Sequence, residues 1–189
     1  GISGATIGMD INTHALEHAN NFANIQGSLL QGNFHHLPLA KNTVALSVGL
    51  DAFDQSQTNL KIALAEIFRT LINDGLLLIR VSAHPWLLGQ HDQSFGTGRR
   101  FTKSEICSDL TKAGFKIERF TYANSIMLLP AIITRLAINF KFVTVENQFD
   151  TPRILNVLLT KILLLEASLL KFINLPAGLS IYILARKPK

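Results

Sequence analysis

Three polar residues, Asp10, Asn33 and Asp51, stand at the ends of short segments that predict β-strands. Ligands of open α/β sheets bind outside the carboxyl ends of the strands, where these side chains would lie. A carboxylate such as Asp10 can accept hydrogen bonds from both hydroxyls of a ribose, and the amide of Asn33 can bond the edge of an adenine. Together the three residues fit a nucleoside-shaped ligand. Each one alone also has a simpler interpretation, because Asp and Asn commonly end strands at turns.

The elements that must position these residues alternate between strands and helices. The run Val44–Leu50 is apolar and small, as in a strand buried on both faces, and Thr102 with Glu105 predicts a capping box that opens a helix. Such alternation predicts an α/β fold with an open, mostly parallel sheet. We expect a turn at 73–75, strands over 5–9, 28–31, 44–50, 76–81, 115–121 and 179–185, and helices from Thr13 and over 58–72, 102–113, 125–149 and 152–174.

The last two predicted strands are separated by two helices rather than by a single crossover helix. They are therefore expected to pair antiparallel at the sheet edge. We divide the chain into a core, residues 1–124 and 176–189, and a helical annex, residues 125–175.

Composition excludes several classes of protein. With 48% hydrophobic and 16% charged residues among 189, the chain is not intrinsically disordered. Its single cysteine, Cys107, excludes an internal disulfide and favours a reducing, cytoplasmic compartment. His84 and His91 are separated by six intervening residues in a loop without further ligands, so no metal site is expected. No apolar run approaches the roughly 20 residues of a membrane-spanning helix.

The charge is unevenly distributed along the chain. Residues 1–98 carry four basic and seven acidic side chains, a net charge of −3, whereas residues 99–189 carry fourteen basic and six acidic ones, a net charge of +8. The second half can face an anionic partner, or its basic residues can simply solubilise an apolar region. The basic residues are scattered and form no recognised nucleic-acid motif, so binding of nucleic acid is not expected.

Short motifs along the first half follow a familiar order: Ile7-Gly8-Met9-Asp10, Gln31-Gly32-Asn33, Leu50-Asp51-Ala52-Phe53-Asp54, and a helix that ends before Gly75. This order resembles the second to fifth strands of class I S-adenosylmethionine-dependent methyltransferases. The string from Ala83-His84-Pro85-Trp86 to Arg99-Arg100-Phe101-Thr102 resembles a bacterial subgroup related to methyltransferase types 11 and 12, which acts on small molecules or glycans. The resemblance implies a Rossmann-like fold.

The resemblance also implies roles for individual residues. S-adenosylmethionine would be the cofactor, with Asp10 at its ribose and Asn33 at its adenine. The residues that would bind it are Asp10, Ile11, Asn33, Phe34, Gly49, Leu50 and Asp51. The last three would border the methyl group and the acceptor.

The loop over 82–100 would serve the methyl acceptor. Methyl transfer needs proximity and orientation and sometimes a base, and the resemblance offers His84, His91 and Asp92 as candidates. Trp86, Arg99 and Arg100 would bind the acceptor, the arginines through an anionic group. A structural interpretation stands beside each role: His91 and Asp92 can brace the loop by hydrogen bonds, the two arginines can cap or pair with the sheet edge, and Trp86 can be lid packing.

The chain departs from the family at its start. The family carries a Gly-rich loop after its first strand, whereas residues 1–9 already resemble the approach to the second strand. The resemblance therefore implies a core whose first strand and helix are missing, as in a fragment or a truncated product.

Three functional hypotheses follow. The first is an S-adenosylmethionine-dependent methyltransferase acting on a small-molecule or glycan- or lipid-linked acceptor. The second is a non-catalytic interaction module, for which the missing Gly-rich loop and Asn33, where the family usually has Asp, are the motivation. Peripheral membrane contact through the apolar, basic annex is a further possibility.

Overall fold

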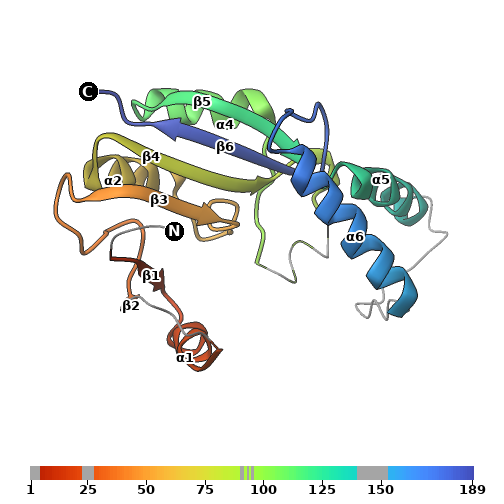
Figure 1. The fold of residues 1–189 in the computed structure, drawn as a ribbon, viewed down its shortest axis with the longest axis horizontal. Coiled ribbons are helices and arrows are strands. Elements are labelled where there is room, and N and C mark those ends of the chain that lie inside the picture. Colours follow the sequence, from red (N-terminus) through yellow and green to blue (C-terminus); the bar gives the residue numbers. More distant parts are fainter. Residues whose placement is uncertain (1–4, 23–27, 90–91, 93, 95, 140–152) are drawn as a thin grey trace.

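The structure is a computed structural model that describes residues 5–22, 28–89, 92, 94, 96–139 and 153–189. Its strands form two groups (Figure 1). In the smaller group, β1 (Ile7–Asp10) pairs in parallel with β2 (Ser28–Gln31), and α1 (Thr13–Phe22) connects them along the chain. This is the predicted strand–helix–strand start.

The larger group is a four-stranded sheet in the order β3-β4-β6-β5. Its strands are β3 (Val44–Leu50), β4 (Leu71–Ser82), β5 (Lys116–Ala123) and β6 (Ser180–Arg186). β3 and β4 are parallel, whereas β6 runs antiparallel to both β4 and β5. The predicted antiparallel pairing of the last two strands at the sheet edge is confirmed, with β6 as the inner strand and β5 as the outer one.

The hydrophobic core lies on one face of this sheet. Alternate residues of β4 and β6, such as Leu77, Ile79 and Ile183, are fully buried there. They pack with α2 (Leu60–Thr70) and α4 (Lys103–Lys112), which cover that face (Figure 1). The opposite face is open along β3, where Leu46, Val48 and Leu50 are exposed.

Helix ends follow the sequence signals closely. Asn59 caps α2 by accepting from the backbone N–H of Ile62, and the predicted Thr102–Glu105 capping box is present at α4. Gly114, just beyond α4, has a φ of 96°, a conformation that a residue with a Cβ rarely adopts.

The prediction of a helix stop and turn at 73–75 is wrong, because the structure has a strand there. These residues belong to β4, where Val44 pairs with Leu71 but Leu46 pairs with Leu76, so the extra residues form an irregular bulge. Asp74 sits in this bulge with a φ of 62°. A helix-stop signal and a bulge use the same residue types, because both need a left-handed backbone position.

The annex contains α5 (Ser125–Asn139) and α6 (Arg153–Leu169). The remainder of the predicted helix over 125–149 and the start of that over 152–174 fall outside the described residues. Glu166 of α6 accepts hydrogen bonds from the backbone N–H groups of Asn124 and Ser125, so it caps the start of α5. Among the residues that the structure describes, no helix is both long and apolar enough to cross a membrane.

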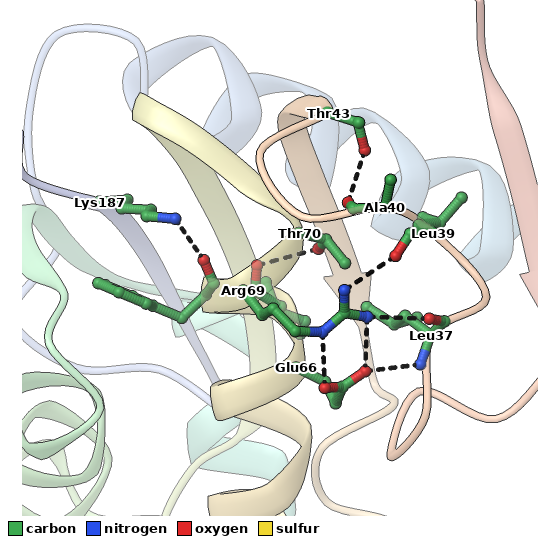
Figure 2. Close-up of polar contacts among 10 residues, drawn as sticks. Leu37, Leu39, Ala40, Thr43, Glu66, Arg69, Thr70 and Lys187 are labelled. Atoms are coloured by element: carbon green, nitrogen blue, oxygen red, sulfur yellow. Dashed lines mark hydrogen bonds and ion pairs between the residues drawn. The ribbon is translucent and has the colours of Figure 1, made fainter.

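An ion pair ties the segment after β2 to the larger sheet's helix α2 (Figure 2). Glu66 and Arg69 bond each other at 2.9 Å on one turn of α2. Glu66 also accepts from the backbone N–H of Leu37, and Arg69 donates to the carbonyls of Leu37 and Leu39 at 3.0 Å. The pair therefore fixes the path of the chain between β2 and β3.

We expect Glu66→Gln to lower the free energy of unfolding by about 1–2 kcal/mol at neutral pH, because charge-assisted hydrogen bonds are lost. The hydrogen bond from Arg69 is the main cause that lowers the pKa of Glu66 below its usual 4.5. A lowered pKa gives stability that is present above the ordinary pKa and is lost as pH falls through the folded one. Urea unfolding at neutral and acidic pH should therefore show a smaller acid loss for the variant than for the parent; an equal loss would contradict the assignment.

Candidate functional site

A cavity of about 560 Å³ opens at the carboxyl ends of β3, β4 and β5. Because β6 is antiparallel, its first residues lie at the same edge. The cavity is lined by Asp51, Asp54, Gln55, Arg80, Ser82, Asp92, Thr97, Arg100, Asn124, Met127, Leu179 and Ser180. This is the edge at which ligands of α/β sheets bind.

Asp51 follows β3 directly and forms an ion pair with Arg80 of β4. Arg80 also donates to Ser180 Oγ at 3.1 Å, so the pair spans β3, β4 and β6. Burial raises the pKa of Asp51; the Arg80 charge opposes this effect and the neighbouring Asp54 adds to it. The carboxylate of Asp51 and the guanidinium of Arg80 therefore form an ion pair in a partly desolvated part of the cavity.

Asp54 is the most deeply buried polar group of the cavity wall. Its Oδ2 accepts from the backbone N–H of Ser82 at 3.1 Å, whereas its Oδ1 is buried without a hydrogen-bond partner among the described residues. Arg80 Nε, in the same wall, is likewise buried without a partner there. Unsatisfied buried polar atoms are uncommon and can mark a place that a ligand or a water completes.

The buried ion pair between Asp92 and Arg100 braces the loop before α4. Arg100 donates to Asp92 Oδ1 at 2.6 Å and to the Ala83 carbonyl at 2.9 Å. Asp92 Oδ2 accepts from the backbone N–H of Gly89 at 2.8 Å. Both Asp92 oxygens and the Arg100 guanidinium therefore already have hydrogen-bond partners within the protein.

The other loop candidates lie outside the cavity lining. His84 has a φ of 64° and stacks on Tyr122 with ring centroids 5.7 Å apart, and burial lowers the pKa of its imidazole. Trp86 is exposed and tilts against His84. Arg99 lies over the Phe101 ring, 4.3 Å from its centroid. His91 lies outside the described residues.

Asp10 and Asn33 lie on the smaller sheet, away from the cavity lining. Asp10 is the last residue of β1, and its Oδ1 accepts from the backbone N–H of Asn12 at 2.8 Å. Asn33 follows β2, and its Oδ1 accepts from the backbone N–H of His35 at 2.9 Å. Both side chains and that of Ile11 are exposed. They stand at neighbouring strand ends, because Asp10 pairs with Gln31.

An aromatic contact connects the segment after β2 with the segment after β3. Phe34, after β2, meets the ring of Phe53 edge-on at a centroid distance of 6.1 Å. Gly49 of β3 lies so close to Phe53 that a Cβ would come within 2.3 Å of the ring. Gly49 and Phe34 thus have packing roles, while Leu50 points to the open face of the sheet.

Sequence reasoning missed Asp54, Arg80, Asn124 and Ser180 as site residues. The signal for Arg80 was a charged side chain inside an otherwise apolar strand. Asn124 shows itself only in three dimensions, where its Nδ2 donates to Ser180 Oγ at 3.0 Å across 56 residues of sequence.

Neither metal nor thiol chemistry is indicated in the described part of the chain. No three His, Cys, Asp or Glu side chains gather there in a way that could hold a metal ion. Burial raises the pKa of the Cys107 thiol, which disfavours the nucleophilic thiolate.

Comparison with known proteins gives one family match and many structural ones. Residues 2–79 match the model of the methyltransferase domain family. This range contains every residue predicted to bind the cofactor. A search of curated proteins gives no match.

Three solved structures illustrate the fold similarity. A chain in the complex between the Haloferax volcanii Trm112 methyltransferase activator and a methyltransferase has a TM-score of 0.64 at 15% identity, over 98% of this chain and 73% of that one. A Bacillus halodurans protein described as a methyltransferase has a TM-score of 0.62 at 18% identity, over 98% and 84%. Geranyl diphosphate methyltransferase in complex with S-adenosylmethionine has a TM-score of 0.62 at 15% identity, over 98% and 69%. The chain therefore has the Rossmann-like fold of the S-adenosylmethionine-dependent methyltransferases.

Proposed function

We propose that the chain is the core of an S-adenosylmethionine-dependent methyltransferase. The observation that carries the proposal is that the methyltransferase-domain match spans the strand ends at Asp10, Asn33 and Asp51. The cavity beside Asp51 provides room for a methyl acceptor at the same edge. Fold likeness alone would not support an activity, so the proposal depends on these residues.

The residues at the strand ends fit the nucleoside half of the cofactor. The exposed carboxylate of Asp10 would accept from the ribose hydroxyls, and the amide of Asn33 would bond the adenine. Ile11 and Phe34 would provide apolar contact, and Gly49, Leu50 and Asp51 would border the reacting centre. When bound, S-adenosylmethionine supplies a methyl group activated by a sulfonium.

Asp54 is our candidate for the residue that faces the acceptor. Its buried, unpartnered Oδ1 would receive a hydrogen bond from an acceptor O–H or N–H. Arg100 and Asp92 would hold the cavity wall through their ion pair. Trp86, Arg99 and His84 lie outside the cavity lining and would contact only an acceptor that extends beyond it. A small molecule carried on a glycan or lipid has that shape.

A further strand and helix would complete the sheet. Among the residues that the structure describes, β3 pairs with β4 alone, and Leu46, Val48 and Leu50 beside its other edge are exposed. An added strand between β1 and β3 would form hydrogen bonds with the backbone groups at this edge, and an added helix would cover the three exposed apolar side chains. We propose that this unit carries the Gly-rich turn for the amino-acid end of the cofactor, and that residues 125–175 cap the acceptor pocket of a cytoplasmic enzyme.

Calorimetry with S-adenosylmethionine tests the cofactor site. We expect a chain extended at its N-terminus by the completing strand and helix to bind more tightly than residues 1–189. Asp10→Ala should weaken binding by about ten- to hundredfold, because charge-assisted hydrogen bonds to the ribose are lost. Asp109→Ala, which removes a half-buried carboxylate of α4 that is not among the predicted cofactor-binding residues, is the matched control. An equal loss of binding in the Asp10→Ala and Asp109→Ala variants, or no loss of binding in either variant, would exclude the site.

The second candidate is a non-catalytic interaction module. The observation that favours it is that both Asp92 oxygens accept hydrogen bonds from within the protein. Asp92, one of the predicted bases of the loop, therefore has no oxygen left without a partner to accept a proton from a methyl acceptor. Methyl transfer to any acceptor by residues 1–189 would exclude this candidate.

A further inference from the structure

α5 presents a continuous row of apolar side chains to solvent. Ile126, Leu129, Ile133 and Leu136 are spaced three or four residues apart, so they lie on one face of the helix, and all four are exposed. Leu129 reaches 64% exposure. A helix that turns a face of this kind to water is expected to have a partner.

α6 also exposes apolar side chains, on the side that faces away from the sheet. Leu163 and Glu166 of this helix, with Leu170 just beyond it, line a second cavity, of about 410 Å³, against the sheet. Leu158, Leu164, Leu165 and Leu169 are exposed instead, and beyond the helix Phe172 is 85% exposed. Figure 1 shows α5 and α6 together beyond the end of the sheet opposite the chain's C-terminus.

In the described part of the annex, the charged side chains that reach solvent are all basic. Arg153, Lys161 and Lys171 are exposed, whereas Glu166, the acid among the described residues 125–139 and 153–174, is buried and engaged with the start of α5. Arg153 and Lys161 are separated by about 12 Å along α6, and Lys171 lies just beyond the end of that helix. Such spacing suits an extended anionic surface better than a single acidic pocket.

We propose that the exposed faces of α5 and α6 bind an anionic lipid bilayer. The apolar side chains would enter the interface between headgroups and acyl chains, and the cations would pair with anionic headgroups. Met127 of α5 lines the strand-end cavity, so the membrane-bound helix borders the cavity. If the proposed methyl transfer holds, this arrangement selects a lipid-linked acceptor presented at the bilayer surface. The binding itself requires neither cofactor nor activity.

Flotation of the whole chain with vesicles tests the proposal. We expect co-flotation with vesicles of phosphatidylcholine and phosphatidylglycerol, and much less with phosphatidylcholine alone. Leu129→Ser with Ile133→Ser should weaken vesicle binding by at least about tenfold, because the variant loses several aliphatic carbon groups that would be buried in the bilayer. Lys161→Glu with Lys171→Glu should weaken it by a similar factor and remove its salt dependence.

Ile62→Ser is the matched control, because Ile62 is an exposed apolar side chain on α2, away from the annex. It should float like the parent. Absence of flotation, or equal loss in the control and in the Leu129 and Ile133 pair, would overturn the proposal. Light scattering that shows a dimer of the parent chain and a monomer of the Leu129→Ser, Ile133→Ser variant would also overturn the proposal. The exposed face would then bind a second copy of the chain. Flotation of a chain that fails to bind S-adenosylmethionine would uphold the lipid surface while the cofactor proposal falls.

Discussion

Arg100→Ala is expected to lower the free energy of unfolding by about 3–5 kcal/mol, because it leaves a buried carboxylate without its partner. The Asp92 side chain is 8% exposed and that of Arg100 is 15% exposed. After the substitution, Asp92 would keep the backbone N–H of Gly89 as its hydrogen-bond donor but no compensating charge. The Ala83 carbonyl would also lose its bond from the guanidinium.

Urea unfolding measures the effect, and a double-mutant cycle assigns it. Asp92→Ala with Arg100→Ala removes both charges, so the double variant should be more stable than the sum of the two single losses predicts. Arg99→Ala is the neighbouring control, because Arg99 is exposed and its nearest contact to Asp109 spans 3.9 Å; its loss should stay small. A loss below about 1 kcal/mol for Arg100→Ala would mean that the pair does not brace the loop.

Asp54→Asn is expected to lower methyl transfer by about hundredfold, a typical factor for a lost acid–base contact. Asparagine keeps the shape of the side chain and an oxygen for the backbone N–H of Ser82. It removes the charge that the buried Oδ1 carries without a partner. The variant should therefore be at least as stable as the parent, because an uncompensated buried charge is costly.

This combination separates a role in binding the acceptor from a role in folding. The rate of label transfer from S-adenosylmethionine, measured on the N-terminally extended chain, should fall while the midpoint of thermal unfolding holds or rises. Glu118→Gln, an exposed substitution on β5 opposite Arg186, should leave the rate unchanged. A rate that survives Asp54→Asn would remove Asp54 from the acceptor site, and a fall in both rate and stability would make its role structural.

The order of elements was predictable because it depends on local patterns. Val44–Leu50 and Ser28–Gln31 match β3 and β2 to the residue, and the Thr102 cap placed the start of α4 correctly. The bulge in β4 was not predictable, since Asp74 and Gly75 serve equally well in a turn. Which strand of the antiparallel pair lies inside was also hidden, because it depends on the pairing of β6 with β4.

The candidate site was predictable in the loop over 82–100, where Asp92 and Arg100 line the cavity, and where a residue ends a strand. Asp51 was identified in this way, and the structure places it in the cavity wall. The residues that complete the wall come from distant segments, as the contact of Arg80 with Ser180 shows, and single-sequence patterns do not carry such pairings. Asp92 and Arg100 carried suggestive residue types, but only three-dimensional contacts reveal that they bond each other.

Hydrogen exchange with and without S-adenosylmethionine tests the central claim most directly, because it reports which backbone amides the cofactor protects. On the N-terminally extended chain, we predict added protection at Asp10 and Ile11, at Asn33 and Phe34, and at Gly49–Asp51, together with the completing strand. The same protection should be absent from Asp10→Ala. Protection confined to α5 and α6, or no protection in a folded, extended chain, would contradict the account.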